Sequence, residues 1–175
     1  MTMAVGWVAV DQRSPASVYI ASDSRFTWGE LSGPKYDYGR KVFACRNSAD
    51  IFVYCGDVLF SSNELGRIVE MADSGLLYDC NSISNERFNV INYHLRKLFS
   101  TYPSSALGAD IQIFHISRDI DGQFHFYKYS YNKVCGWNNS EIIADLSKSK
   151  VIFTAGVGKA QFNYLYNNTE TIKLT

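Results

Sequence analysis

Hydrophobic and polar residues follow two different periods along this chain. Short apolar and β-branched runs, bounded by turn residues, open the chain and return after residue 110. Between these two regions apolar residues recur at a spacing of about 3.6, the period of a helix face. The resulting order is strands, two helices, strands and a last helix. Strands and helices segregated in this way favour an α+β fold with antiparallel sheets over a parallel βαβ fold.

The expected strands are rich in β-branched and aromatic residues and lie between turn signals. They are Met3–Val10, Ser17–Ser22, Lys41–Arg46, Ile51–Cys55, Ile111–Ser117, Gln123–Tyr131 and Val151–Ala155. Pro15 marks a turn that joins the first two strands into an antiparallel hairpin. Gly29, Gly33 and Pro34 indicate a loop after this hairpin, and Asp121-Gly122 predicts a second hairpin.

A first helix is expected after residue 57. Its apolar face consists of Leu65, Ile68, Val69, Ala72 and Leu76. Ser61 and Glu64 match a capping box at its start, and Asp57 is an alternative cap for an earlier start. The pattern leaves both starts open.

Two further helices are expected. One runs from Asn85 to Thr101, with Ser84 as its N-cap and Pro103 just beyond its end. A short helix over Lys159–Asn167 follows the last strand.

Composition narrows the class of protein. The chain has 175 residues, of which 46% are hydrophobic and 15% aromatic, so we predict a single β-rich domain over residues 1–175. Its 17 basic and 17 acidic residues balance, which argues against nucleic acid as a partner. No apolar run reaches the length of a membrane span, and the start lacks a basic signal region. We therefore expect no membrane partner and a cytoplasmic location.

The cysteines and histidines form no metal signature. The cysteines, which we expect to be buried thiols, are Cys45, Cys55, Cys80 and Cys135. His115 and His125 could face each other across a hairpin, but no further ligand completes a tetrahedral site. We predict neither a metal nor a cofactor.

Gly156-Val157-Gly158-Lys159 resembles part of a phosphate-binding loop only superficially. Phe153 stands where that loop needs its first glycine, and Ala160 stands where it needs Ser or Thr. We interpret the glycines as a tight strand-to-helix turn. No serine-hydrolase elbow and no local Cys-His signature is present either.

Thr2 follows Met1 directly and precedes the first strand. Removal of Met1 would give Thr2 a free α-amine, whose ordinary pKa of about 7.7–8.0 suits a general base at neutral pH. A threonine activated by its own amine is a known nucleophile. Retention of Met1 would lock that nitrogen in a peptide bond and remove the base.

An ordered set of short motifs accompanies this start. They are Thr2-Met3-Ala4-Val5-Gly6, Ile20–Gly29, Gly39–Phe43, Val53–Asp57 and Phe153–Gly158. In this set, which covers essentially the whole chain, the sequence resembles the proteasome β-subunit family and the HslV-type peptidases, both N-terminal nucleophile hydrolases. The resemblance implies a four-layer αββα sandwich of two antiparallel sheets with the helices outside.

The resemblance also implies site residues. Thr2 would be the nucleophile, Asp23 and Lys41 would form an ion pair beside it, and the Gly56 N–H would stabilise the oxyanion. A nearby lysine cation favours the neutral amine. Two simpler readings stay open: Asp23 binding turn amides, and Lys41 as a solvated strand charge.

Three hypotheses for function follow. The first is a threonine-type peptidase or amidase acting on a peptide or amide substrate through an acyl-enzyme. The second is a non-catalytic assembly or binding subunit of the same fold. It is favoured by Val157, where the family carries a serine, and by the 17 residues after Gly158, which indicate a fragment or a minimal variant. The third is an unrelated α+β binding module.

Self-association, in a ring for example, is implied as well. Tyr127, Tyr129 and Tyr131 alternate with polar residues and form a row on one strand face. The row is either an interface or a face covered by the chain's own helices.

Overall fold

The computed structural model describes residues 3–12, 14–28, 32–79 and 81–169. It divides into two compact units, one of Met1–Gly39 with Ala144–Thr175 and one of Arg40–Ile143. Every strand pairing between the described residues is antiparallel, which confirms the α+β class. The single domain and the four-layer stacking depend on how the units pack together, and both stay predictions.

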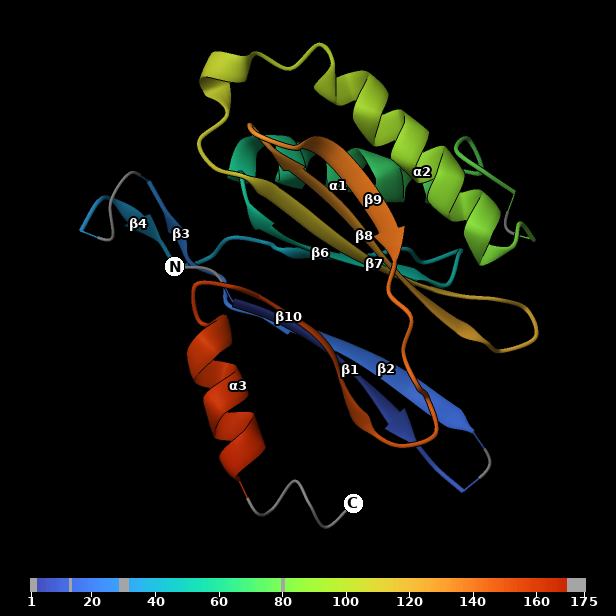
Figure 1. Cartoon of the computed structure of the whole chain (residues 1–175). Helices are drawn as coiled ribbons and strands as arrows, with labels where there is room; N and C mark the ends of the chain where they lie inside the picture. Colours follow the sequence, from blue (N-terminus) through green and yellow to red (C-terminus); the bar gives the residue numbers. More distant parts are fainter. Residues whose placement is uncertain (1–2, 13, 29–31, 80, 170–175) are drawn as a thin grey trace. The chain divides into compact units, whose positions relative to one another are not determined.

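The first unit is a small sheet with a helix and a hairpin (Figure 1). Its sheet has the order β10 (Lys150–Gly156), β1 (Met3–Val10), β2 (Pro15–Ser22). Helix α3 (Lys159–Asn168) follows β10 directly, and none of its described side chains is buried. Strands β3 (Phe26–Thr27) and β4 (Lys35–Tyr36) form a separate hairpin. Gly6 is required in β1 because any side chain there would collide with the Phe153 ring of β10.

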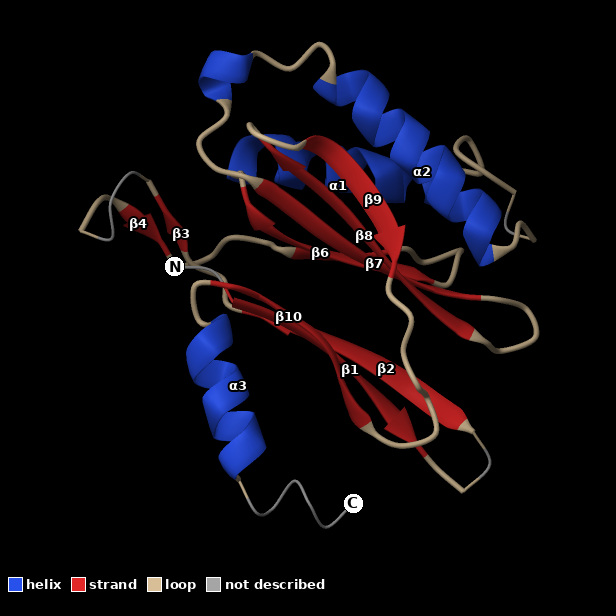
Figure 2. Cartoon of the chain, in the orientation of Figure 1, coloured by secondary structure: helices blue, strands red, loops and turns tan. Residues whose placement is uncertain are grey.

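The second unit is a five-stranded antiparallel sheet with helices on one face (Figure 2). Its strands, in spatial order, are β5 (Val42–Ala44), β6 (Asp50–Gly56), β7 (Ile111–Arg118), β8 (Phe124–Asn132) and β9 (Gly136–Glu141). Helix α1 (Val58–Asp73) packs on β5 and β6, and helix α2 (Ser84–Phe99) packs on β8. A 3-10 turn, η1 (Ser104–Ala106), leads from α2 towards β7.

The tyrosine row of β8 is covered by α2. Phe88 of α2 stacks on the Tyr127 ring with centroids 4.3 Å apart, and Phe99 packs on Tyr131 at the same separation. Tyr127 and Tyr129 are 2% and 0% exposed. The interface reading of this row is therefore wrong, because the chain's own helix needs these rings as its core.

The helix starts differ in part from the sequence expectation. For α1 the structure selects Asp57, whose Oδ1 accepts a hydrogen bond from the Phe60 N–H at 2.9 Å. The capping-box start at Ser61 is wrong, because Ser61 is fully buried inside the helix. Leu76 lies beyond the end of α1 and is 75% exposed, so it is not part of the helix face.

Helix α2 uses a distant cap. Its N-cap residue is Ile83, not Ser84, and the Ile83 side chain caps nothing. Instead, the Asp119 carboxylate accepts hydrogen bonds from the Ser84 N–H at 2.6 Å and from the Ser84 hydroxyl at 2.5 Å. Ser84 is thus the first residue of the helix and a donor to its cap.

Several strands differ from the prediction as well. Strand β2 begins at Pro15, a position that proline tolerates because it is the first residue of a strand. Strand β5 is shorter than predicted and leaves Lys41 just before it. The hairpin β3–β4 and the strand β9 were not expected. Strand β9 has the polar sequence GWNNSE, which carries no strand signal of its own.

Candidate functional site

The start of β1 is tied to the end of β2 through Asp23. The Met3 N–H donates to Asp23 Oδ1 at 2.7 Å, and the Asp23 N–H donates back to the Met3 carbonyl at 3.1 Å. Asp23 therefore binds the backbone amide at the start of β1. Thr2 and Met1 lie outside the described residues, so the predicted nucleophile is not placed.

Lys41 lies just before β5 in the second unit and is only 2% exposed. The reading of Lys41 as a solvated charge is therefore wrong. A lysine this deeply buried needs compensation for its lost hydration, so Lys41→Ala is not a low-cost substitution. Asp23 belongs to the first unit and Lys41 to the second. The Asp23–Lys41 pair stays a prediction.

Gly56 ends β6 with a φ of 99°, in the region that favours glycine. A side chain there would collide with the Asp110 carbonyl oxygen, which also accepts from the Asp57 N–H at 3.1 Å. The end of the β6–β7 ladder and the turn into α1 therefore require glycine, whether or not the site is catalytic. Its role as oxyanion donor stays a prediction.

Residues 156–158 form the turn from β10 into α3. Gly156 has a φ of 91°, and Gly158 is the N-cap residue of α3. Val157 between them is 68% exposed and carries no hydroxyl group. The strand-to-helix turn predicted for these glycines is confirmed.

A buried polar network lies in the second unit, and sequence reasoning missed it. Asp50 at the start of β6 is its centre. The Asp50 carboxylate contacts His115 Nε2 at 2.8 Å, the Tyr78 hydroxyl at 3.0 Å and Arg87 Nη1 at 3.3 Å. On its other side, His115 Nδ1 lies 3.1 Å from the Tyr129 hydroxyl. Asp50, Arg87, His115 and Tyr129 are each at most 3% exposed.

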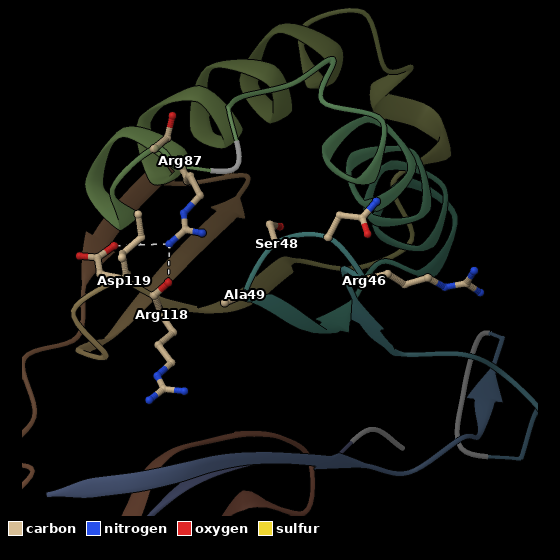
Figure 3. A pocket seen from close by; sticks show the side chains of 9 residues that line it. Arg46, Ser48, Ala49, Arg87, Arg118 and Asp119 are labelled. Atoms are coloured by element: carbon tan, nitrogen blue, oxygen red, sulfur yellow. Dashed lines mark hydrogen bonds and ion pairs between the residues drawn. The ribbon is translucent and has the colours of Figure 1, made fainter.

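The network continues to the surface through Asp119. Arg87 Nη2 donates to the Arg118 carbonyl at 2.7 Å and contacts Asp119 Oδ1 at 3.4 Å (Figure 3). Asp119 Oδ2 lies 3.2 Å from His125 Nε2, and His125 Nδ1 lies 3.3 Å from the Glu141 carboxylate. Carboxylates thus alternate with His125 and Arg87 from exposed Glu141 inward to Asp50.

Electrostatics lowers the pKa values of two carboxylates of the network, Asp50 and Asp119. Burial alone would raise the pKa of Asp50, but hydrogen bonding and charge from His115, together with the Arg87 charge, hold it well below its usual range. Burial would likewise raise the pKa of Asp119, but the hydroxyl and N–H of Ser84 lower it. Burial raises the pKa of Tyr129 well above its ordinary value, so its hydroxyl keeps its proton.

A pocket of about 350 Å³ adjoins this network. Arg46, Arg87 and Arg118 contribute to its lining, but they do not converge on one point. Figure 3 shows the Arg46 and Arg118 side chains extending away from Arg87. Arg118 Nε instead donates to the Gly122 carbonyl at 3.2 Å. Arg87 contacts Asp50 through Nη1 and Asp119 through Nη2, so it connects α2 to β6 and to the β7–β8 turn.

The histidine and cysteine expectations are met only in part. His115 pairs with Tyr127, and His125 pairs with Ser117, so the two histidines are not opposite each other. Cys55 is buried as expected, Cys45 is half-buried, and Cys135 is exposed, which contradicts the expectation for Cys135. Burial raises the pKa of Cys45 to about 11, so it is a thiol at neutral pH. Cys80 lies outside the described residues.

The described part of the chain contains no cluster of His, Cys, Asp or Glu that could hold a metal ion. Among the same residues, no helix has the length and apolar character needed to cross a membrane.

The fold is similar to that of solved Anbu structures. The helical assembly of the Anbu complex from Pseudomonas aeruginosa matches 95% of this chain with a TM-score of 0.65 at 14% sequence identity. Anbu (ancestral beta-subunit) from Yersinia bercovieri matches 95% with a TM-score of 0.60 at 11% identity. An Anbu (Gly-1) mutant from Hyphomicrobium sp. strain MC1 matches 95% with a TM-score of 0.60 at 13% identity. This chain spans 65–66% of the length of these three proteins.

No protein-family model and no curated protein matches the sequence. The structural likeness therefore shows a proteasome-like fold and nothing finer.

The family named from the sequence is wrong. The similar structures are Anbu proteins, not proteasome β-subunits or HslV-type peptidases with a threonine nucleophile. The physical reason lies in the motifs themselves. Gly6 avoids Phe153, Gly56 avoids the Asp110 carbonyl, and Asp23 binds the Met3 amide. These residues meet demands of the fold, so they indicate the fold without distinguishing families that share it.

Proposed function

We propose that this protein is a self-associating subunit of a proteasome-like assembly, and that assembly or binding is its function. The observation that carries this proposal is the likeness of 95% of the chain to Anbu structures, one of which is a helical assembly. The chain's balanced charge supports it, because copies of a neutral chain do not repel one another. A cytoplasmic location is part of the proposal.

The proposal includes the four-layer αββα arrangement. Two features of the separate units support it. The five-stranded sheet carries α1 and α2 on one face, and the three-stranded sheet is followed by a helix that contacts β10. Both sheets are antiparallel, as this arrangement requires.

A threonine-type peptidase or amidase is the second candidate. The Met3–Asp23 hydrogen bonds favour it, since they fix the backbone directly after Thr2 beside a carboxylate. In this mechanism the Thr2 hydroxyl attacks a peptide or amide carbonyl, and the Thr2 amine takes the proton. Lys41 would support the neutral amine, and the Gly56 N–H would bind the oxyanion. Exposed Val157 counts against it, because no hydroxyl group is available there to orient the amine.

Sedimentation velocity at micromolar concentration tests the main proposal. We expect species much larger than the 19.8 kDa chain, and particles of regular shape in negative-stain electron microscopy. A monomer at all concentrations would overturn the proposal.

Intact mass and turnover of fluorogenic peptides separate the two candidates. We expect no turnover, whether or not Met1 is removed. Turnover that requires Met1 removal and is abolished in Thr2→Ala would instead establish the second candidate. In that case Lys41→Ala should also abolish turnover, with circular dichroism checking that the variant is folded.

A further inference from the structure

Four aromatic side chains are grouped on and beside the β3–β4 hairpin of the first unit. We call this group the aromatic hairpin: Phe26, Trp28, Tyr36 and Tyr38. Trp28 is 53% exposed, Tyr36 is 49% and Tyr38 is 84%. Neighbouring rings touch, with centroids 6.3 Å apart for Phe26–Trp28, 6.2 Å for Phe26–Tyr36 and 5.9 Å for Tyr36–Tyr38. Scattered exposed aromatics are ordinary, whereas a contiguous exposed group indicates a binding surface.

The aromatic hairpin is held in shape before any partner arrives. The Trp28 N–H donates to the Pro34 carbonyl at 3.1 Å, and the Gly39 N–H donates to the Ser24 carbonyl at 2.8 Å. The Phe26 ring occupies the space that a side chain on Gly39 would need. An aromatic surface that such contacts hold in place loses less conformational entropy on binding, so more of its contact energy becomes affinity.

The second unit carries a groove of about 470 Å³ beside α1 and the end of β5. Its lining includes Arg40, Arg46, Val69, Glu70 and Asp73. The groove is also built in advance, because Asp73 Oδ1 accepts hydrogen bonds from the backbone N–H groups of Arg46 and Asn47 at 2.7 and 2.9 Å.

We propose that the aromatic hairpin of one copy docks into the α1 groove of the next copy. The inference rests on the proposed function, since it names the contact through which copies assemble. A helical assembly repeats a head-to-tail contact, which needs two different and complementary patches on every copy. This chain has an exposed aromatic patch and a groove, and its neutral net charge does not oppose their contact.

The chemistry of the two patches is complementary. Arginine guanidinium groups bind aromatic faces. Arg40, which lines the groove, makes such a contact within its own chain, 4.3 Å from the ring centroid of buried Phe43. Arg46 is exposed at the groove. The exposed Glu70 carboxylate can accept a hydrogen bond from a tyrosine hydroxyl of the partner copy.

Single substitutions test each patch by sedimentation velocity. We expect Trp28→Ala and Tyr38→Ala each to weaken assembly by about tenfold or more, as for buried aromatic anchors, and Arg46→Glu to do so from the groove side. Tyr93→Ala is the matched control, because Tyr93 is a 67% exposed tyrosine on α2, and we expect it to assemble as the wild type does.

Mixing the variants gives the decisive result. A Trp28→Ala/Tyr38→Ala chain keeps its groove, and an Arg46→Glu chain keeps its hairpin. An equimolar mixture should therefore form a 1:1 heterodimer and nothing larger, because one intact contact remains per pair. Absence of this heterodimer, with both variants folded and monomeric, would overturn the pairing of hairpin with groove.

Two other outcomes distinguish a failure of the proposed function from a failure of the hairpin–groove contact alone. A wild-type chain that is monomeric contradicts the proposed function and this inference with it. A wild-type chain that assembles together with hairpin variants that assemble equally well overturns only this inference. If a hairpin variant fails to fold, a photo-crosslinking residue at position 38 replaces it, and a crosslink to residues outside 40–74 of the other copy would contradict the proposed contact.

Discussion

The two units of the molecule bury their side chains to very different extents. The second unit covers one face of a five-stranded sheet with two long helices, whose residues Leu65, Ile68, Ile91 and Leu95 are 0% exposed. The first unit has three strands in its sheet and one helix, α3, without a buried described residue. Its rings at Trp28, Tyr36 and Tyr38 face solvent. We infer that the second unit supplies most of the stability, and that the first unit supplies surface for partners.

We expect the largest loss of stability when the charge at the centre of the buried network is removed. Asp50→Asn leaves Arg87 and His115 without their carboxylate, and breaking a buried ion pair costs about 3–5 kcal/mol. We expect that loss in the free energy of unfolding measured by urea denaturation.

Asp37→Asn is its control. Asp37 pairs with Arg25 at the surface, where the two side chains are 53% and 48% exposed. We expect no change in its denaturation midpoint. An Asp50→Asn chain as stable as the wild type would contradict the assignment of stability to the second unit.

A second test compares one leucine from a helix of each unit. Leu95 of α2 is 0% exposed, and Leu165 of α3 is 55% exposed. Leu95→Ala should lower the free energy of unfolding by about 2–5 kcal/mol, since it creates a cavity. Leu165→Ala should change it by less than about 0.5 kcal/mol. Equal effects in thermal denaturation would remove the distinction between the helices.

A third, smaller effect concerns the inner end of the network. Tyr129→Phe keeps the ring but leaves His115 Nδ1 without its hydroxyl partner, and an unpaired buried polar group costs about 1–3 kcal/mol. The control is Tyr131→Phe, in the same row but half-buried, which should cost less. Urea denaturation of both variants measures the difference. The reverse order would show that the hydroxyl of Tyr129 contributes little.

The smallest expected effect is a pH dependence. The pKa of Asp50 is lower in the folded chain than the usual value of about 3.9 for an unfolded one, because His115 and Arg87 outweigh the effect of burial. Its stabilising contribution is therefore present above about pH 4 and is lost as the pH falls further. At pH 3 the loss from this group is about 1 kcal/mol. Denaturation of wild type and Asp50→Asn at pH 7 and pH 3 measures it, and the variant should lose less.

Local patterns predicted most of the fold, because its regular elements carry their own signals. The change from strand-like runs to a helical period located α1 and α2, and the glycines at 156 and 158 located the turn into α3. Strand β9 was missed because its polar sequence becomes a strand only through pairing with β8, for example Tyr131 with Trp137. Its stability comes from its neighbour and is not visible locally.

The buried network could not be predicted from the sequence for a different reason. Asp50 lies 37 residues from Arg87 and 65 from His115 along the chain, and only the sheet register and the docking of α2 bring them together. One signal was present. His115 occupies an inward position in a strand of apolar residues, and a fully buried histidine needs polar partners.

For the candidate site, the sequence predicted which positions matter but did not determine what they do. The turn at Gly56 and the Met3–Asp23 hydrogen bonds are fold requirements, and they gave the resemblance its strength. For the same reason they could not distinguish one family from another that shares this fold.

The distant cap of α2 has a consequence for the order in which the chain becomes structured. Asp119, which caps Ser84, follows it by 35 residues, so a ribosome completes α2 well before it makes the cap. An isolated helix of 16 residues is only marginally stable in water. The nascent helix therefore becomes stable only when Asp119 of the β7–β8 turn caps it. We expect the two segments to become protected from hydrogen exchange together during refolding.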